Sequence, residues 1–173
     1  MPPQGKIIND DYTSKQQNAE ALNSLLSAIE ISSHGTARDA GTKFETLIRD
    51  WLVNEPTYKD RFSSVQTWKD WANTHPEKTT NAKDTGIDLV GTLSDGSGFA
   101  AIQCKFYAKD DIVPKAGIDS FLATADARRF KERFLIATND HWTDNAQETL
   151  RRAFPPVTLI KRSDLAASLV NWS

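Results

Sequence analysis

The chain has few of the features that cross-link or anchor small proteins. It contains one cysteine among 173 residues, which excludes an internal disulfide. It has no apolar run long enough to span a bilayer, and residues 1–16 lack the apolar segment of a secretion signal. These absences predict a protein of the reducing cytoplasm that makes no membrane contact.

An excess of positive charge is also missing. The net charge is −2 and the isoelectric point is about 5.9, so the chain lacks the overall basicity of a stand-alone nucleic-acid binder. No phosphate loop of the form GxxxxGK[ST] is present, and the chain alone is therefore not expected to hydrolyse ATP. The three histidines lack the spacing of zinc ligands, so no zinc site is expected.

Basic residues instead form short local clusters in the second half of the chain. Such clusters bind phosphate groups in some proteins and form ordinary solvated surface in others, and the sequence leaves both interpretations open. The candidates for DNA contact are Arg128, Arg129, Lys131, Arg151 and Arg152.

The composition, with 39% hydrophobic and 25% charged residues, is typical of a folded domain. Helical periodicity is expected over residues 14–31, 36–52, 68–72, 114–126, 143–153 and 163–168. Strands are expected over residues 62–67, 87–93, 99–106, 133–138 and 157–161, and a polar loop over 73–84. This order predicts an α/β fold, a mixed β-sheet flanked by helices. Residues 1–34 are expected to form a tail and helical arm, which either packs on the core or joins an interface, and residues 35–173 the main domain.

The strands over 87–93 and 99–106 are joined by an Asp95-Gly96 dipeptide, a strong signal for a tight hairpin. A two-residue loop would place Asp88 opposite Gln103, and a four-residue loop over 95–98 would place it opposite Lys105. Side chains alternate between the faces of a sheet, so either register leaves these three residues on one face. The other face is expected to be core, formed by Ile87, Leu89, Ile102, Cys104 and Phe106.

A carboxylate, an amide and an ammonium group would thus meet at one end of the hairpin. Asp88 and Gln103 can offer hard oxygen ligands to Mg²⁺, the type that this ion prefers. Lys105 cannot bind a metal while protonated, but it can orient a water molecule and stabilise charge on a phosphate. One carboxylate only half-neutralises a divalent ion, so a second is expected from elsewhere.

Glu45 is the candidate for that second carboxylate. It lies in the amphipathic helix over 36–52, at the edge of an apolar stripe formed by Phe44, Leu47, Ile48, Trp51 and Leu52. From that edge it can either reach toward the end of the sheet or simply remain solvated.

The motif Asp84-Thr85-Gly86-Ile87-Asp88, followed by Gln103-x-Lys105 and preceded by Gly41-x-x-Phe44-Glu45, resembles the Mrr-like branch of the PD-(D/E)xK nucleases. Over about residues 35–173 the chain also resembles the amino-terminal nuclease domain of single-chain, ATP-dependent Type ISP restriction-modification enzymes. The resemblance implies the restriction-endonuclease-like fold.

The same resemblance assigns roles to the motif residues. It implies Asp88, Gln103 and Glu45 as ligands of Mg²⁺, with Mn²⁺ able to substitute, the Cys104 main-chain carbonyl as a further ligand, and Lys105 as the catalytic lysine. Two departures from the general PD-(D/E)xK pattern stand out: Ile87 replaces the proline before Asp88, and Gln103 is neutral, although the resemblance implies that both features are usual in the Mrr-like branch. A neutral ligand predicts weaker metal binding and disfavours a two-metal mechanism.

The sequence therefore predicts a Mg²⁺-dependent DNA endonuclease domain that hydrolyses phosphodiester bonds. Its expected partners are DNA and, in a longer protein, helicase or translocase and methyltransferase domains on its C-terminal side. The alternatives are a non-catalytic DNA-binding or assembly module with the same fold, a solitary Mrr-like nuclease, and a nuclease of the same fold acting on RNA or branched DNA.

Overall fold

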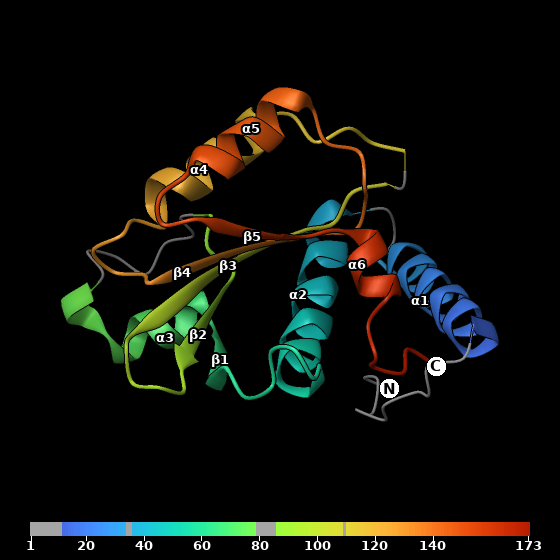
Figure 1. Ribbon diagram of the computed structural model, residues 1–173, viewed down its shortest axis with the longest axis horizontal. Coiled ribbons are helices and arrows are strands. Elements are labelled where there is room, and N and C mark those ends of the chain that lie inside the picture. Colours follow the sequence, from blue (N-terminus) through green and yellow to red (C-terminus); the bar gives the residue numbers. More distant parts are fainter. Residues whose placement is uncertain (1–11, 34–35, 79–85, 109) are drawn as a thin grey trace.

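The structure, a computed structural model, describes residues 12–33, 36–78, 86–108 and 110–173. Its centre is a five-stranded sheet in the order β1-β2-β3-β4-β5, in which β1 to β3 are antiparallel and β3 to β5 are parallel (Figure 1). The strands are β1 (Phe62–Thr67), β2 (Leu89–Leu93), β3 (Phe99–Lys105), β4 (Glu132–Ala137) and β5 (Val157–Ile160). The mixed sheet confirms the predicted α/β class.

Helices cover both faces of the sheet and enclose two apolar cores. They are α1 (Tyr12–Ser32), α2 (Ala37–Asn54), α3 (Trp68–Thr74), α4 (Ala116–Thr124), α5 (Asp144–Arg152) and α6 (Arg162–Ala166), with a short 3-10 turn η1 (Pro76–Lys78). One core lies between the sheet and α1, α2 and α6, and the other between the sheet and α3, α4 and α5. Figure 1 shows α4 and α5 together above β5, and α1, α2 and α6 gathered at the right.

Helix α2 forms where its apolar periodicity predicts. Every residue of the predicted stripe is buried, and Ala40 extends the stripe by one turn. The Arg49 side chain donates a hydrogen bond of 2.9 Å to the carbonyl of Val65 on β1, which fixes the helix against the sheet. The edge of α2 that carries Glu45 therefore has a defined position relative to the strands.

Helix α1 packs on the core, as the first of the two alternatives expects, and a role in an interface stays a prediction. Leu22, Leu26 and Ile29 are buried in the core shared with α2. Asn18, also buried, donates to the carbonyls of Ser168 (3.3 Å) and Val170 (2.8 Å), and its side-chain oxygen accepts from the Trp172 amide (2.8 Å). The division of the chain at residue 34 stays a prediction.

The hairpin has the register predicted for a two-residue loop, with Leu89 opposite Ile102 and Val90 opposite Ala101. The loop itself matches neither predicted form, because it has four residues, as in the second alternative, but these are 94–97 and not 95–98. The Leu93 amide donates to the Gly98 carbonyl, which leaves four residues, 94–97, between the closing pair.

The prediction for Ile87 was wrong, because the alternation of the strand breaks at Asp88. The Asp88 amide donates to the carbonyl of Ile102, and its own carbonyl accepts from the amide of Trp68. Ile87 consequently packs in the core of α3 and α4, whereas Leu89, Ile102 and Cys104 lie in the core of α1 and α2.

Strand β3 is also shorter than predicted. It ends at Lys105, so Phe106 lies just past the strand, although it still packs against the core of α1 and α2. Half of the predicted loop over 73–84, residues 79–84, lies outside the described residues, and the described half continues α3 to Thr74 and then forms η1. No helix in the described ranges is long and apolar enough to cross a membrane.

The buried Asn18 provides a test of whether α1 is part of the folded body. We expect Asn18→Ala to lower the free energy of unfolding by about 2–3 kcal/mol, because it leaves buried main-chain groups without partners. Urea denaturation followed by circular dichroism measures this change. Gln16→Ala, on the exposed side of the same helix, is the control and should change stability little. Equal effects of the two substitutions would show that α1 is a loosely attached arm.

Candidate active site at the fork between β2 and β3

The candidate site lies where β2 and β3 separate. Their ladder ends at Leu89 and Ile102, but β3 continues to Lys105 and there pairs only with β4. In the resulting fork the Asp88 carboxylate accepts a hydrogen bond of 2.8 Å from the amide of Cys104. The Asp88 carboxylate thus accepts from the Cys104 amide, which has no partner on β2, and this amide lies between Gln103 and Lys105 in the chain.

The side chain of Gln103 lies inside the protein, with only 4% of its surface exposed. Its amide oxygen Oε1 is buried and has no hydrogen-bond partner among the described residues. Gly86, which adopts a positive φ of 87°, lies beside the other end of this amide, because a Cβ at position 86 would be 3.6 Å from Nε2. An unsatisfied buried acceptor normally costs stability, so Gln103 is a candidate for ligand binding.

Glu45 reaches the same region from α2. Its neighbour Phe44 packs edge-on against Phe106, with ring centroids 5.9 Å apart, which aligns this turn of the helix with the end of β3. The pKa of the Cys104 thiol is raised well above its usual value, first by burial and then by the negative charges of Asp88 and Glu45. Both carboxylates therefore lie within electrostatic range of one sulfur atom.

The four predicted residues meet at one end of the sheet, but they do not approach from one face. Strand alternation places Gln103 and Lys105 with Ala101, on the face covered by α4, whereas Glu45 belongs to α2 on the opposite face. Asp88 lies at the edge between these faces. The prediction of a single face, made for Asp88, Gln103 and Lys105, therefore describes Gln103 and Lys105 but not Asp88.

The donor set is suited to a hard cation. Two carboxylates and an amide oxygen are ligands that Mg²⁺ and Mn²⁺ accept. No group of three or more His, Cys, Asp or Glu side chains that would hold a metal occurs in the described part of the chain. A metal at this fork would therefore depend on the amide and on main-chain oxygens to complete its ligands.

One residue that fixes the site was not found by sequence reasoning. The main-chain amide of Trp68, the first residue of α3, donates 3.0 Å to the carbonyl of Asp88 and so holds the carboxylate-bearing residue in place. Trp68 and Trp71 pack in the core, with ring centroids 5.4 Å apart. No sequence signal reveals such a main-chain contact between residues twenty positions apart.

The basic clusters lie at the other end of the sheet. Arg128, Arg129 and Lys131 immediately precede β4, whereas Lys105 is paired with the last residue of that strand, Ala137, about 17 Å away along an extended chain. The guanidinium of Arg129 is held by the Asp126 carboxylate and by main-chain carbonyls. The structure therefore separates this cluster from the candidate site.

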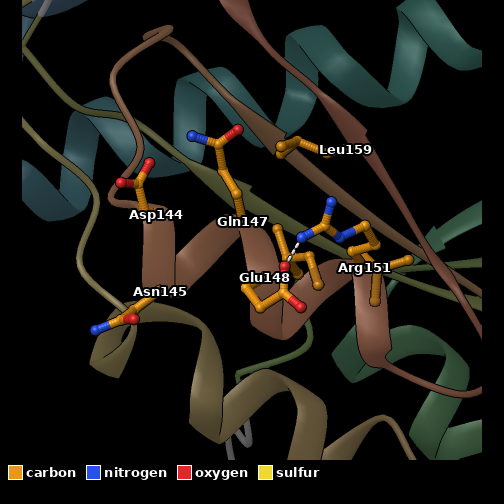
Figure 2. A pocket seen from close by; sticks show the side chains of 8 residues that line it. Asp144, Asn145, Gln147, Glu148, Arg151 and Leu159 are labelled. Atoms are coloured by element: carbon orange, nitrogen blue, oxygen red, sulfur yellow. Dashed lines mark ion pairs between the residues drawn. The ribbon is translucent and has the colours of Figure 1, made fainter.

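Arg151 and Arg152 also stand apart, at the end of α5, where both form ion pairs with Glu148. Figure 2 shows this region, a groove of about 700 Å³ between α5 and β5. Its lining includes Gln147 and Leu159 but none of the four candidate site residues. The groove is therefore distinct from the fork between β2 and β3.

Comparison with known proteins identifies the family. A sequence profile described as a restriction endonuclease family, Mrr_cat_2, matches residues 53–173, which include Asp88, Gln103 and Lys105 but not Glu45. The structure is similar to that of an ATP-dependent Type ISP restriction-modification enzyme, LlaBIII, bound to DNA, with 32% identity and a TM-score of 0.59. The match covers 75% of this chain and 8% of that enzyme, so this chain spans a small fraction of its length.

Two further solved structures show weaker similarity. The DNA modification-dependent restriction endonuclease AspBHI is 16% identical, with a TM-score of 0.49 over 96% of this chain and 39% of its own. The MspJI restriction endonuclease in complex with a 27-mer oligonucleotide is 16% identical, with a TM-score of 0.47 over 93% of this chain and 34% of its own. No curated protein matched the sequence. Because the profile covers well over half of the chain and includes both strands of the fork, the chain belongs to the Mrr-type restriction endonuclease family and is a nuclease domain.

Proposed function

We propose that this nuclease domain is a Mg²⁺-dependent DNA endonuclease, acting in the cytoplasm as the nuclease module of a larger restriction-modification or helicase-containing enzyme. The observation that carries the proposal is the buried Oε1 of Gln103, which has no hydrogen-bond partner among the described residues, on the residue that precedes the Cys104 amide bound by the Asp88 carboxylate. A protein gains nothing in stability from such an acceptor. A metal ion bound at the fork would satisfy it.

The residues at the fork fit a divalent ion. Asp88, Glu45 and Gln103 would hold it through side-chain oxygens and Cys104 through its main-chain carbonyl, while the Cys104 thiol is buried in the core of α1 and α2. The bound ion supplies positive charge against the phosphate and lowers the pKa of water. Two carboxylates balance one divalent ion, which supports a single metal rather than two.

Lys105 is proposed to act on the phosphate directly. It is the last residue of β3, only partly buried, and its ammonium group would stabilise the negative charge that develops on the phosphate oxygens while orienting the attacking water. The Cys104 amide holds the Asp88 carboxylate in a fixed position beside it. A rigid main chain thus sets the spacing between the acidic and the basic group.

DNA as substrate, and further domains as partners, are supported by the similarity to a DNA-bound enzyme of which this chain spans only 8%. The net charge of −2 gives the domain little attraction for DNA by itself. Arg128, Lys131, Arg151 and Arg152, all exposed, remain proposed phosphate contacts for DNA that extends beyond the site. Delivery of DNA by neighbouring domains, such as a helicase and a methyltransferase, would compensate for this weak attraction.

The first test is DNA cleavage. We expect the wild-type chain to nick plasmid DNA with Mg²⁺ or Mn²⁺, and Asp88→Asn or Lys105→Met to lower the single-turnover rate about 100-fold or more, because each removes charge stabilisation at the phosphate. Asp119→Asn on α4 and Lys69→Met on α3 remove exposed charges elsewhere and should cut at the wild-type rate. Wild-type cutting by either site variant would contradict the assignment.

The second test is metal affinity. Because Gln103 is a neutral ligand, Gln103→Glu should tighten Mn²⁺ binding about 10-fold in isothermal titration calorimetry, and Gln103→Met should weaken it by at least as much. Asp88→Asn should abolish the binding heat. If the wild-type chain binds no Mn²⁺ and none of these substitutions changes that, the domain is a non-catalytic module with the nuclease fold.

The third test concerns stability without metal. Gln103→Met replaces an amide whose oxygen has no partner among the described residues by an apolar group of similar shape, so we expect an unchanged or higher free energy of unfolding, by up to about 1 kcal/mol. The control is Arg133→Met, since buried Arg133 donates to the carbonyls of Ala125 and Pro155 and its loss should destabilise. Chemical denaturation in EDTA measures both. A clear loss of stability in Gln103→Met would show that the amide has a structural role instead.

A further inference from the structure

The chain must leave the sheet immediately after Lys105, and the main-chain groups of the next residues need new partners. β3 pairs with β4 as far as Lys105 and Ala137, and no strand continues beyond them. A strand end of this kind frays unless something holds it. The position of Lys105 therefore depends on the residues that come directly after the two strands.

Thr138, the first residue after β4, supplies the missing partners. Its amide donates 3.1 Å to the carbonyl of Lys105, which extends the ladder by one bond. Its hydroxyl accepts from the Tyr107 amide at 2.7 Å and donates to the Tyr107 carbonyl at 2.7 Å. One side chain, 0% exposed, thus satisfies both main-chain groups of Tyr107 and continues the parallel pairing after the strands have ended.

Phe106 lies between Lys105 and Tyr107, the two residues that Thr138 holds, and it faces α2. Its ring meets Phe44 edge-on, and Phe44 is the residue before Glu45. The segment 105–107 therefore carries Lys105 at one end, is held by the Thr138 hydroxyl at the other, and contacts the Glu45 turn of α2 in the middle. A shift of this segment would move the lysine and the helix-borne carboxylate relative to Asp88 together.

We propose that Thr138 is a positioning residue for DNA cleavage: its hydroxyl clamps residues 105–107 and thereby sets where Lys105 and Glu45 stand relative to Asp88. The proposal rests on the proposed function, since it assumes that Lys105 acts on the phosphate while Asp88 and Glu45 hold the metal ion. Thr138 itself touches no reacting atom. It acts only through the main chain that it holds.

The clamp can be removed with little change in shape. Thr138→Val keeps the volume and loses the hydroxyl, whereas Thr138→Ser keeps the hydroxyl and loses a methyl group. Displacement of catalytic groups by about 1 Å costs up to about 100-fold in rate, so we expect Thr138→Val to lower the single-turnover cleavage rate about 10-fold or more. Thr138→Ser should cut within about 3-fold of wild type, because the clamping hydroxyl remains.

Ser168→Ala separates positioning from general destabilisation. The buried Ser168 hydroxyl also makes two hydrogen bonds, accepting from the Trp51 indole at 3.0 Å and the Val170 amide at 3.1 Å, but it lies in the core of α1 and α6, away from the fork. The Ser168→Ala substitution should destabilise the fold about as much as Thr138→Val and leave the cleavage rate unchanged. Rates are compared on full-length chains at a temperature where circular dichroism shows every variant folded.

DNA affinity is measured in parallel by fluorescence anisotropy with Ca²⁺. The dissociation constant should be the same for the wild-type chain and both Thr138 variants, so that the loss appears in the rate alone.

A Thr138→Val rate equal to that of Ser168→Ala, or a Thr138→Ser rate as low as that of Thr138→Val, would overturn the proposal. In both cases Asp88→Asn would still abolish cutting, so the site assignment would survive. A wild-type chain that cuts no DNA, or Asp88→Asn that cuts normally, would instead overturn the proposed function and the positioning role with it.

Discussion

The hydrogen bond from the Cys104 amide to the Asp88 carboxylate is the contact on which the geometry of the site depends. It forms because β2 stops pairing with β3 after Leu89, while β3 continues for three residues with β4 as its only strand partner. The Cys104 amide has no acceptor on β2 and needs one from elsewhere, since a buried main-chain donor without an acceptor would destabilise the fold. A carboxylate fills the position, and in doing so is fixed between Gln103 and Lys105.

The fork also explains how groups from both faces of the sheet converge. β3 is the strand at which the sheet changes from antiparallel to parallel pairing, and its C-terminal end is open on the β2 side. Gln103 and Lys105 reach that end from the face of α4, and Glu45 from the face of α2. The buried Oε1 of Gln103, which has no hydrogen-bond partner among the described residues, is unfavourable for stability alone, a pattern typical of sites kept for function.

Local patterns in the sequence predicted the elements well. The apolar stripe of α2 and the hairpin register both appear in the structure, because each depends on residues close in the chain. The inversion of Ile87 was not predictable, since it follows from a main-chain bond between Asp88 and distant Trp68. The Thr138 clamp likewise joins segments thirty-one positions apart, and a lone threonine after a strand gives no signal of it.

The central claim is that Asp88, Gln103 and Glu45 hold one divalent ion at the fork. The most direct measurement is an anomalous difference map from crystals of the chain grown with Mn²⁺. The account predicts a single peak in contact with the carboxylate oxygens of Asp88 and Glu45 and with Oε1 of Gln103, at the distances of direct oxygen ligands, about 2.0–2.6 Å. A peak elsewhere on the molecule, or an empty fork in which Gln103 Oε1 accepts a hydrogen bond from the protein, would contradict it.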